Sequence, residues 1–277
     1  MRDVPRHPRE MSRDTTASSE TVQTTNACGR WRVSCNARAM GRLGVIAGSA
    51  LRESAFAAHG TRVVHAGVAM LDVDGTCVVQ RHGLDDWVPP HRIDHRAHIE
   101  ALLDAGVDRV LAISSVGSLR VDWPVGTCAV IDDFYAPAET RSFYDDPRSH
   151  LVPTFDAAWS ARVLAAWKAS TETPIHDGGV YAQTSGPRFE TPAEVRALTA
   201  VADLVGMTVA SECILATEVR LPYAAVCVVD NLANGLGKTP LTLDEFNAGV
   251  AANRARLIAD LDALIPHLAH NLGAVQP

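Results

Sequence analysis

Hydrophobic residues in this chain form short continuous runs that alternate with stretches of helical spacing. Runs of Val, Ile, Leu and Ala bounded by Gly or polar residues are typical of buried strands. They occur at 43–47, 75–80, 109–114, 125–131, 203–207 and 224–229. Helical spacing occurs at 92–104, 155–169, 192–201, 212–220 and 243–264. The alternation predicts one α/β domain with a twisted, mixed β-sheet flanked by helices.

One helix start is marked by side chains as well as by spacing. Thr191 precedes the helical stretch that begins at Pro192, and Glu194 follows three residues after Thr191. A Thr and a Glu at this spacing can each bond the other's backbone N–H, which is a capping box. We therefore expect the helix to begin at Pro192.

The first 40 residues differ from the rest of the chain. They are rich in Arg, Ser and Thr and show no sustained period. Such a segment buries too little apolar surface to offset its ordering entropy, so we expect residues 1–40 to be disordered. The folded domain is expected at residues 41–277. Because Met40 directly precedes the first strand, a translation start there is a hypothesis, and residues 1–40 would then lie outside the functional protein.

Composition narrows the partners and the compartment. The 277 residues are 47% hydrophobic, enough for a large core, and the formal net charge is −7. A mildly acidic protein is a poor partner for nucleic acid or an anionic membrane, and no apolar run approaches the roughly 20 residues of a membrane span. Six cysteines without a C-x-x-C pair predict reduced thiols, a cytoplasmic location and no zinc site.

Several predicted strands end in hydroxyl, basic or acidic residues. In α/β folds the carboxyl ends of strands carry the ligand site, and hydroxyls with an Arg and a His suit a phosphate. Each residue alone fits a turn or cap equally well, and residues 46–51 lack the glycines of a dinucleotide site. As a set they predict a phosphate-binding α/β enzyme. The residues are Ser49, Arg81, His82, Ser114, Ser115, Thr208 and Asp230.

Longer motifs in the chain resemble those of the trimeric purine nucleoside and methylthioadenosine phosphorylases. Residues 186–194 (GPRFETPAE) are similar to that family's GPRFET-x-AE segment, and residues 203–208 (DLVGMT) to its (D/N)-x-VGMT segment. Shorter matches occur in the family's order, and the resemblance spans 43–264. They lie at 44–49, 81–83, 116–119 and 142–145.

The resemblance implies phosphate attack on the anomeric carbon through an oxocarbenium-like transition state, with the leaving purine stabilised at N7. No metal or organic cofactor is implied, and inorganic phosphate is a substrate. Asp230 and His82 would be catalytic. Phosphate would contact Ser49, Arg81, His82, Ser114, Ser115 and Thr208. The nucleoside would contact Val116, Gly117, Phe189, Glu190, Met207, Asp230, Leu232, Leu243 and Phe246.

Base preference depends on Asp230. In this family an Asn at that position suits 6-oxopurines, whereas an Asp suits adenine, because it accepts from the 6-amino group. The resemblance therefore favours 5′-methylthioadenosine or a related 5′-deoxyadenosine, released as adenine and the ribose-1-phosphate. Two departures support the alternative, a 6-oxopurine nucleoside such as inosine or guanosine: Leu232 replaces a second Asp, and Glu190 resembles the residue of the 6-oxopurine type.

The 5′ substituent depends on the closing helix. Leu243 and Phe246 match the segment that forms an apolar 5′ pocket in methylthio-specific members, which favours a thioether over a hydroxyl. The same residues fit the core face of the helix equally well.

Other features of the resemblance concern assembly and unusual positions. It implies a homotrimer in which the loop at 143–150 reaches a neighbouring site. Residues 94–98 (DHRAH) replace the usual Asn-Tyr-Arg-Ala-Asn, and Ser211 replaces a common Pro. A nucleoside hydrolase or a non-catalytic nucleoside-binding relative is disfavoured because the anion-binding set is intact.

Overall fold

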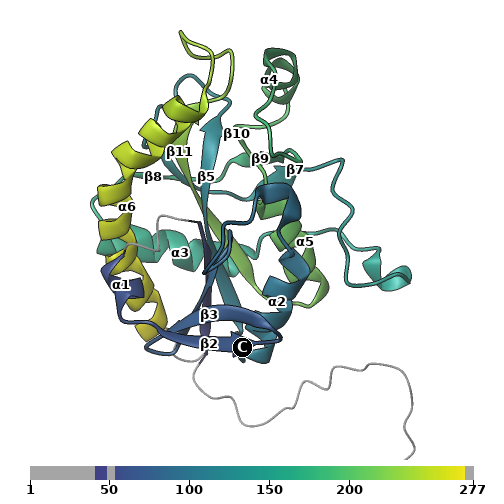
Figure 1. Ribbon diagram of the computed structural model, residues 1–277, viewed down its shortest axis with the longest axis vertical. Helices are drawn as coiled ribbons and strands as arrows, with labels where there is room; N and C mark the ends of the chain where they lie inside the picture. The colour runs from purple at the N-terminus through teal and green to yellow at the C-terminus, as the bar shows by residue number, and fades with distance from the viewer. Residues whose placement is uncertain (1–40, 49–53, 272–277) are drawn as a thin grey trace, which may run out of the picture. The chain divides into compact units, whose positions relative to one another are not determined.

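The computed structural model describes residues 41–48 and 54–271. The expected disorder of residues 1–40 and the candidate Ser49 lie outside the described residues. In the described part, eleven strands join in one mixed sheet (Figure 1). They are β1 (Leu43–Ala47), β2 (Thr61–His65), β3 (Val68–Val73), β4 (Thr76–Gln80), β5 (Arg109–Ser118), β6 (Cys128–Val130), β7 (Asp133–Tyr135), β8 (Ile175–Asp177), β9 (Val180–Gln183), β10 (Leu204–Gly206) and β11 (Tyr223–Leu232).

The helices lie on both faces of this sheet, as Figure 1 shows. Two short 3₁₀ helices, η2 and η3, lie in loops. The bounds are α1 (Ala55–Ala58), η2 (Pro90–Arg92), α2 (His95–Asp104), η3 (Pro147–Ser149), α3 (Ala157–Ser170), α4 (Pro192–Leu198), α5 (Val209–Glu218) and α6 (Leu243–His270). None of these helices is both long and apolar enough to cross a membrane.

Four parallel strands form the centre of the sheet. β1 pairs with β4 and with β5, and β5 pairs along its length with β11. Their carboxyl ends meet at one level, because Ala47 lies opposite both Gln80 and Ile113, and Ser114 lies opposite Cys227. Antiparallel pairs flank this centre: β2–β3–β4 on one side, and β10 against the end of β5. The expected mixed α/β sheet is confirmed.

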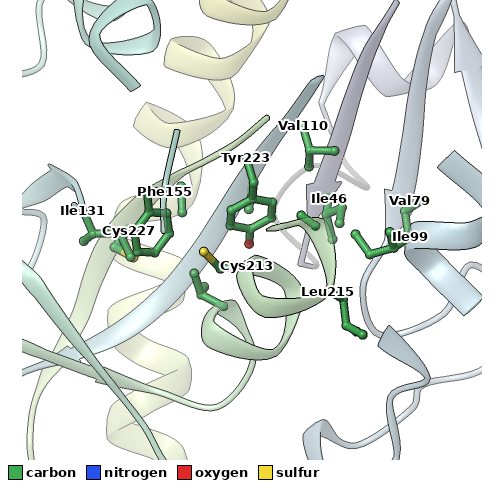
Figure 2. Close-up of a cluster of buried hydrophobic side chains, with 14 of the residues drawn as sticks. Ile46, Val79, Ile99, Val110, Ile131, Phe155, Cys213, Leu215, Tyr223 and Cys227 are labelled. Atoms are coloured by element: carbon green, nitrogen blue, oxygen red, sulfur yellow. The ribbon is translucent and has the colours of Figure 1, made fainter. Parts of the chain in front are cut away.

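The two larger apolar cores of the described residues cover the two faces of the sheet. On one face α3 and α6 pack against β11, with Trp167, Leu261 and Leu264 almost fully buried. On the other face α2 and α5 pack together over Ile46, Ile99 and other side chains, shown in Figure 2. Burial on both faces explains the continuous apolar runs of the central strands.

Candidate active site

A cavity of about 780 Å³ opens at the carboxyl ends of β1, β4, β5 and β11. It collects residues from segments that are far apart in the sequence, as expected of a site at this edge of a parallel sheet. Thirteen of the predicted site residues line it: Arg81, His82, Ser114, Ser115, Val116, Gly117, Phe189, Glu190, Met207, Thr208, Asp230, Leu243 and Phe246.

Leu232 is placed differently from the other candidates. It lies at the end of β11, opposite Ser118, and is not among the residues that line the cavity. The pairing shifts between Val229 and Asn231, so a bulge changes which residues of this strand face the cavity.

Arg81 reaches the cavity from a buried position that the protein fixes tightly. Its Nε and Nη2 donate to the two carboxylate oxygens of Glu212, at 2.6 and 3.0 Å. Nη1 donates to the carbonyl of Ile113 at 2.7 Å, and Nη2 also to that of Ile46 at 3.4 Å. A guanidinium has five N–H donors, so one on Nη1 is left for an anion.

Glu212 was not among the predicted site residues, yet it fixes Arg81. Its side chain is fully buried on α5, and it also accepts from the Tyr223 hydroxyl at 2.7 Å. Burial disfavours the charged carboxyl, but the positive charge and hydrogen bonds of Arg81, together with the nearby His95, outweigh it and hold the pKa of Glu212 well below its usual range. The pair therefore stays charged at all ordinary pH values.

Thr208 precedes α5, but the backbone N–H groups of this helix start are already occupied. Those of Thr208 and Val209 point at the Tyr181 hydroxyl, at 3.1 and 3.4 Å. Those of Ala210 and Ser211 point at Gln183 Oε1, at 2.8 and 3.2 Å. A proline at 211 could not donate in this way. An anion here would meet side chains, among them the Thr208 hydroxyl, which caps no helix N–H.

His82 follows Arg81 with one ring nitrogen already bonded. Nδ1 lies 2.9 Å from the carbonyl of Val88, so Nδ1 carries the proton and donates to that carbonyl. In the neutral ring, Nε2 is then an acceptor. Burial lowers the pKa of His82, with Arg81 adding to the effect. The turn requires Gly83, at φ +87°, because a Cβ there would lie 2.2 Å from the carbonyl oxygen of Asp86.

Asp230 also lines the cavity and is 5% exposed. One carboxylate oxygen accepts from Asn253 of α6 at 2.6 Å, and the other accepts from the Ser115 hydroxyl. Burial raises the pKa of Asp230, while the hydrogen bonds from Ser115 and Asn253 oppose the shift. The Ser115 hydroxyl, a predicted phosphate contact, therefore donates to Asp230 in this structure.

Glu190 and Asn231 also line the cavity. Glu190 is 5% exposed, and its Oε1 accepts from the Thr184 hydroxyl at 2.6 Å, which leaves Oε2. The Asn231 amide donates one N–H to the carbonyl of Leu232 at 2.9 Å, and its second N–H remains. The cavity therefore contains a carboxylate acceptor and an amide donor.

The apolar wall of the cavity comes from two segments. The rings of Phe189 and Phe246 lie 5.6 Å apart, and Leu243 lies three residues before Phe246 on α6. Leu243 is 63% exposed, so it is not part of the apolar core. Leu241 and Val250 continue the same wall.

Sequence reasoning missed several lining residues of α6, including Asn247, Asn253 and Arg254. Phe246, Val250, Asn253 and Leu257 lie three or four residues apart on one helix face, and Asn247 and Arg254 each follow a member of this series. Helical spacing from Phe246 therefore identifies this face once the helix is known to cover the cavity. Glu212 carried no such signal, because its role depends on a contact across 131 residues of sequence.

The fold and the cavity together define an α/β protein of the class that binds small molecules at the carboxyl edge of its sheet. A family model described as the phosphorylase superfamily matches residues 42–266. A probable S-methyl-5′-thioinosine phosphorylase of Methanopyrus kandleri is 33% identical over 83% of this chain and 93% of its own. A probable 6-oxopurine nucleoside phosphorylase of Archaeoglobus fulgidus is 38% identical over 61% and 72%.

A solved structure supports the fold. Methylthioadenosine phosphorylase from Schistosoma mansoni, in complex with adenine, has a TM-score of 0.68 at 22% identity, over 83% of this chain and 92% of that one. The chain belongs to the phosphorylase superfamily and is a purine nucleoside phosphorylase. The predicted family and reaction, phosphorolysis of a purine nucleoside, are confirmed.

Proposed function

We propose that the enzyme prefers a 6-oxopurine nucleoside and that Glu190 and Asn231 hold the base. The pairing of a buried carboxylate with an amide in one cavity is the observation that carries the proposal. A 6-oxopurine presents an N1–H donor and acceptors at O6 and N7. Glu190 Oε2 would accept from N1–H, and the remaining Asn231 N–H would donate to O6 or N7.

Adenine fits these two groups less well. Its N1 is an acceptor, so a carboxylate at this position would leave two acceptors facing each other. Two named relatives, in Methanopyrus kandleri and Archaeoglobus fulgidus, are called phosphorylases of 6-oxopurine substrates, which supports the same base.

Adenine, the base first expected from the sequence, remains the second candidate because of Asp230. Burial raises the pKa of this carboxyl, and a protonated Asp230 would donate to N7 of any purine, while an ionised one would accept from a 6-amino group. Ser115 and Asn253 each occupy one lone pair on the two oxygens of Asp230, so either role would use a second site on one of these oxygens.

In the same cavity we propose that phosphate accepts from the free Arg81 N–H and from the hydroxyls of Ser114 and Thr208, and that its protonated oxygen donates to His82 Nε2. Phosphate held there would attack the anomeric carbon while positive charge develops on the sugar, and the anion would stabilise that charge. The nucleophile comes from solution, so the proposed reaction needs no metal or organic cofactor.

The test compares base release from inosine, guanosine, 5′-methylthioinosine, adenosine and 5′-methylthioadenosine, with and without phosphate. We expect phosphate-dependent release, faster from the 6-oxopurines. Glu190→Gln should reduce kcat/KM for inosine by about 10- to 100-fold, because the bond to N1–H loses its charge. Asp230→Asn is the matched variant: if it abolishes activity while Glu190→Gln does not, adenine-type recognition is correct instead.

Assembly and compartment are proposed on separate grounds. We propose a homotrimer, in which the loop at 143–150 reaches a neighbour from a base anchored by Glu218, which accepts from Ser142 and from the Phe143 N–H, both at 2.6 Å. Sedimentation equilibrium would test the homotrimer, since a monomeric active enzyme excludes a shared site.

We propose a cytoplasmic location, which is supported by four described cysteines that are buried thiols.

A further inference from the structure

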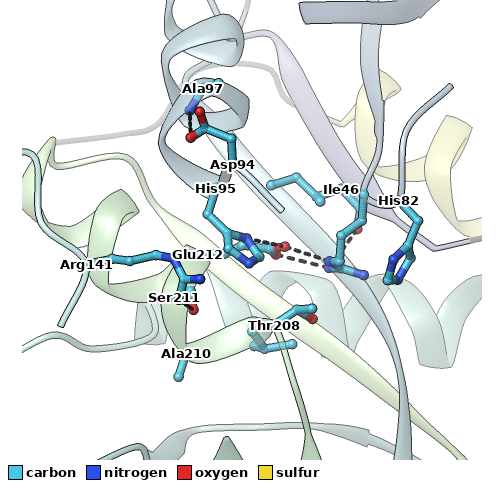
Figure 3. A network of polar contacts seen from close by, with 12 residues as sticks. Ile46, His82, Asp94, His95, Ala97, Arg141, Thr208, Ala210, Ser211 and Glu212 are labelled. Atoms are coloured by element: carbon cyan, nitrogen blue, oxygen red, sulfur yellow. Dashed lines mark hydrogen bonds and ion pairs between the residues drawn. The ribbon is translucent and has the colours of Figure 1, made fainter. Parts of the chain in front are cut away.

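His95 is a buried histidine beside the Arg81–Glu212 pair. It is the first residue of α2 and 1% exposed, and neither ring nitrogen has a hydrogen-bond partner. Its Nδ1 lies 3.5 Å from Glu212 Oε1, and Figure 3 shows the ring facing that carboxylate. A buried polar atom without a partner is destabilising, so the arrangement calls for a role.

A second histidine lies close to His95 on the same helix. His98 lies one turn along α2, with its ring edge-on to His95 at 6.4 Å between centroids. Two imidazoles therefore lie near the Arg81–Glu212 pair.

Glu212 has room for one more donor at the oxygen that faces His95. Oε2 accepts twice, from Arg81 Nη2 and from the Tyr223 hydroxyl, whereas Oε1 has one bonded donor, Arg81 Nε. The ionisable groups around His95 are Arg81 from β4, Glu212 from α5, His82 after β4, and Asp94 and His98 on its own helix. Among them Glu212 is the one acceptor within 4 Å of Nδ1.

We propose that His95 is a positioning residue, whose Nδ1–H donates to Glu212 Oε1 and so holds the carboxylate that orients Arg81 toward phosphate. The 3.5 Å separation shortens to bonding distance when the anion occupies the site, as contacts in unliganded sites do. Four of the five Arg81 N–H donors are bonded within the protein. The direction of the fifth N–H therefore depends on the orientation of the Glu212 carboxylate, which holds the guanidinium in place. The inference rests on the proposed binding of phosphate at Arg81.

The experiment measures KM for phosphate, KM for the nucleoside and kcat in three variants. His95→Phe keeps the ring and removes the donor, while His95→Asn places an amide N–H where Nδ1 lies. His98→Phe is the matched control, because it removes a neighbouring imidazole that does not reach Glu212. We expect His95→Phe to raise KM for phosphate about 10-fold, with the nucleoside KM changed less than about twofold.

In His95→Asn and in the control His98→Phe, KM for phosphate should lie within about threefold of the value for the parent enzyme. The inference is overturned if His95→Phe leaves phosphate KM unchanged, if both KM values rise together, or if His98→Phe has an equal effect. A general loss of packing would produce the last two results.

A measurement on the unmodified enzyme covers the case in which His95→Phe does not fold. In ¹⁵N-imidazole spectra, phosphate should move the His95 Nδ1 signal, assigned with His95→Asn, toward a hydrogen-bonded N–H, and a signal that stays in place contradicts the inference. Failure of the proposed function would look different: release of base by the parent enzyme would not depend on phosphate at all.

Discussion

Arg81 has one N–H donor left for an anion, so its contribution to the proposed phosphate site depends on how the protein orients the guanidinium. Arg81→Lys retains the charge but cannot reproduce the two-oxygen contact with Glu212. We expect KM for phosphate to rise at least about 10-fold and the free energy of unfolding to fall by about 2 kcal/mol, because the buried carboxylate loses donors. Steady-state kinetics and urea unfolding measure the two effects.

Arg62→Lys is the matched control for that substitution. Arg62 also forms a two-oxygen contact with a carboxylate, Asp85, but both side chains are more than half exposed. Exposed pairs contribute little, so neither kinetics nor stability should change measurably. Equal effects in the two variants would show that burial of the Arg81 pair is unimportant.

A substitution at Leu243 tests whether this residue contacts the 5′ group of the nucleoside. It is exposed at the cavity wall, so Leu243→His adds a polar group without disturbing the core. We expect the ratio of kcat/KM for inosine to that for 5′-methylthioinosine to rise about 10-fold, since the imidazole can bond a 5′-hydroxyl but not a thioether. An unchanged ratio would place the 5′ group elsewhere.

His98 makes stability depend on pH. Burial lowers the pKa of His98 to about 4, with His95 and Arg81 adding to the effect, against about 6.5 in the unfolded chain. The unfolded state therefore binds the proton first, and stability present above pH 6.5 is lost as the pH falls toward 4. The loss from this group is about 2 kcal/mol between pH 8 and pH 5.

His98→Asn removes that titration and should flatten the pH dependence by the same amount. Urea unfolding of the parent and the variant at pH 8, 6.5 and 5 gives the comparison. The two would differ by a constant at all three pH values if His98 were protonated equally in both states.

The long helix α6 determines the geometry of the site at the element scale. It packs on β11 through Gly249, where a Cβ would lie 1.7 Å from the carbonyl oxygen of Asp230. Gly249→Ala must displace the helix and separate Asn253 from Asp230. We expect a loss of at least about 2 kcal/mol of stability and reduced kcat, measured by calorimetry and steady-state assay.

The sign of the stability change in Gly249→Ala distinguishes a close helix–strand contact from an exposed helix position. In an exposed helix, Gly→Ala stabilises by about 1 kcal/mol through backbone entropy. A more stable Gly249→Ala variant would show that α6 does not approach β11 so closely.

Strands and helices of the α/β core were predictable because periodicity is local. The run at 43–47 is β1 itself, and the Thr191–Glu194 capping box is present where it was expected. The β2–β3 hairpin was missed, because β2 is largely exposed and its pattern is neither continuous nor alternating. The stretch at 243–264 was too short, since α6 continues through Pro266 to His270.

The sequence motifs predicted which residues line the cavity, but not the contacts that orient them. Position by position the motifs identified thirteen residues that meet in one cavity. They did not show that the Ser115 hydroxyl donates to Asp230, or that Glu212 holds Arg81, because both depend on contacts across more than 100 residues.

At the scale of the whole molecule, the family match begins at residue 42, one residue before β1. A chain that starts at Met40 should therefore keep its unfolding temperature, and its kcat/KM within about twofold, because the family match and every described strand are retained. Starting at Gly48 is the control: it removes β1, which pairs with both β4 and β5, and should prevent folding. An inactive Met40 form would assign a necessary role to residues 1–40.

One helix touches both the acid at the base side and the wall proposed for the 5′ group. Asn253 of α6 donates to Asp230, and Leu243 and Phe246 of the same helix line the cavity. Because α6 is one continuous helix, a shift of α6 moves all three residues together. Descendants of the enzyme that adapt α6 to a new tail on the sugar would alter nucleobase choice in the same step, so the two specificities should change together during evolution.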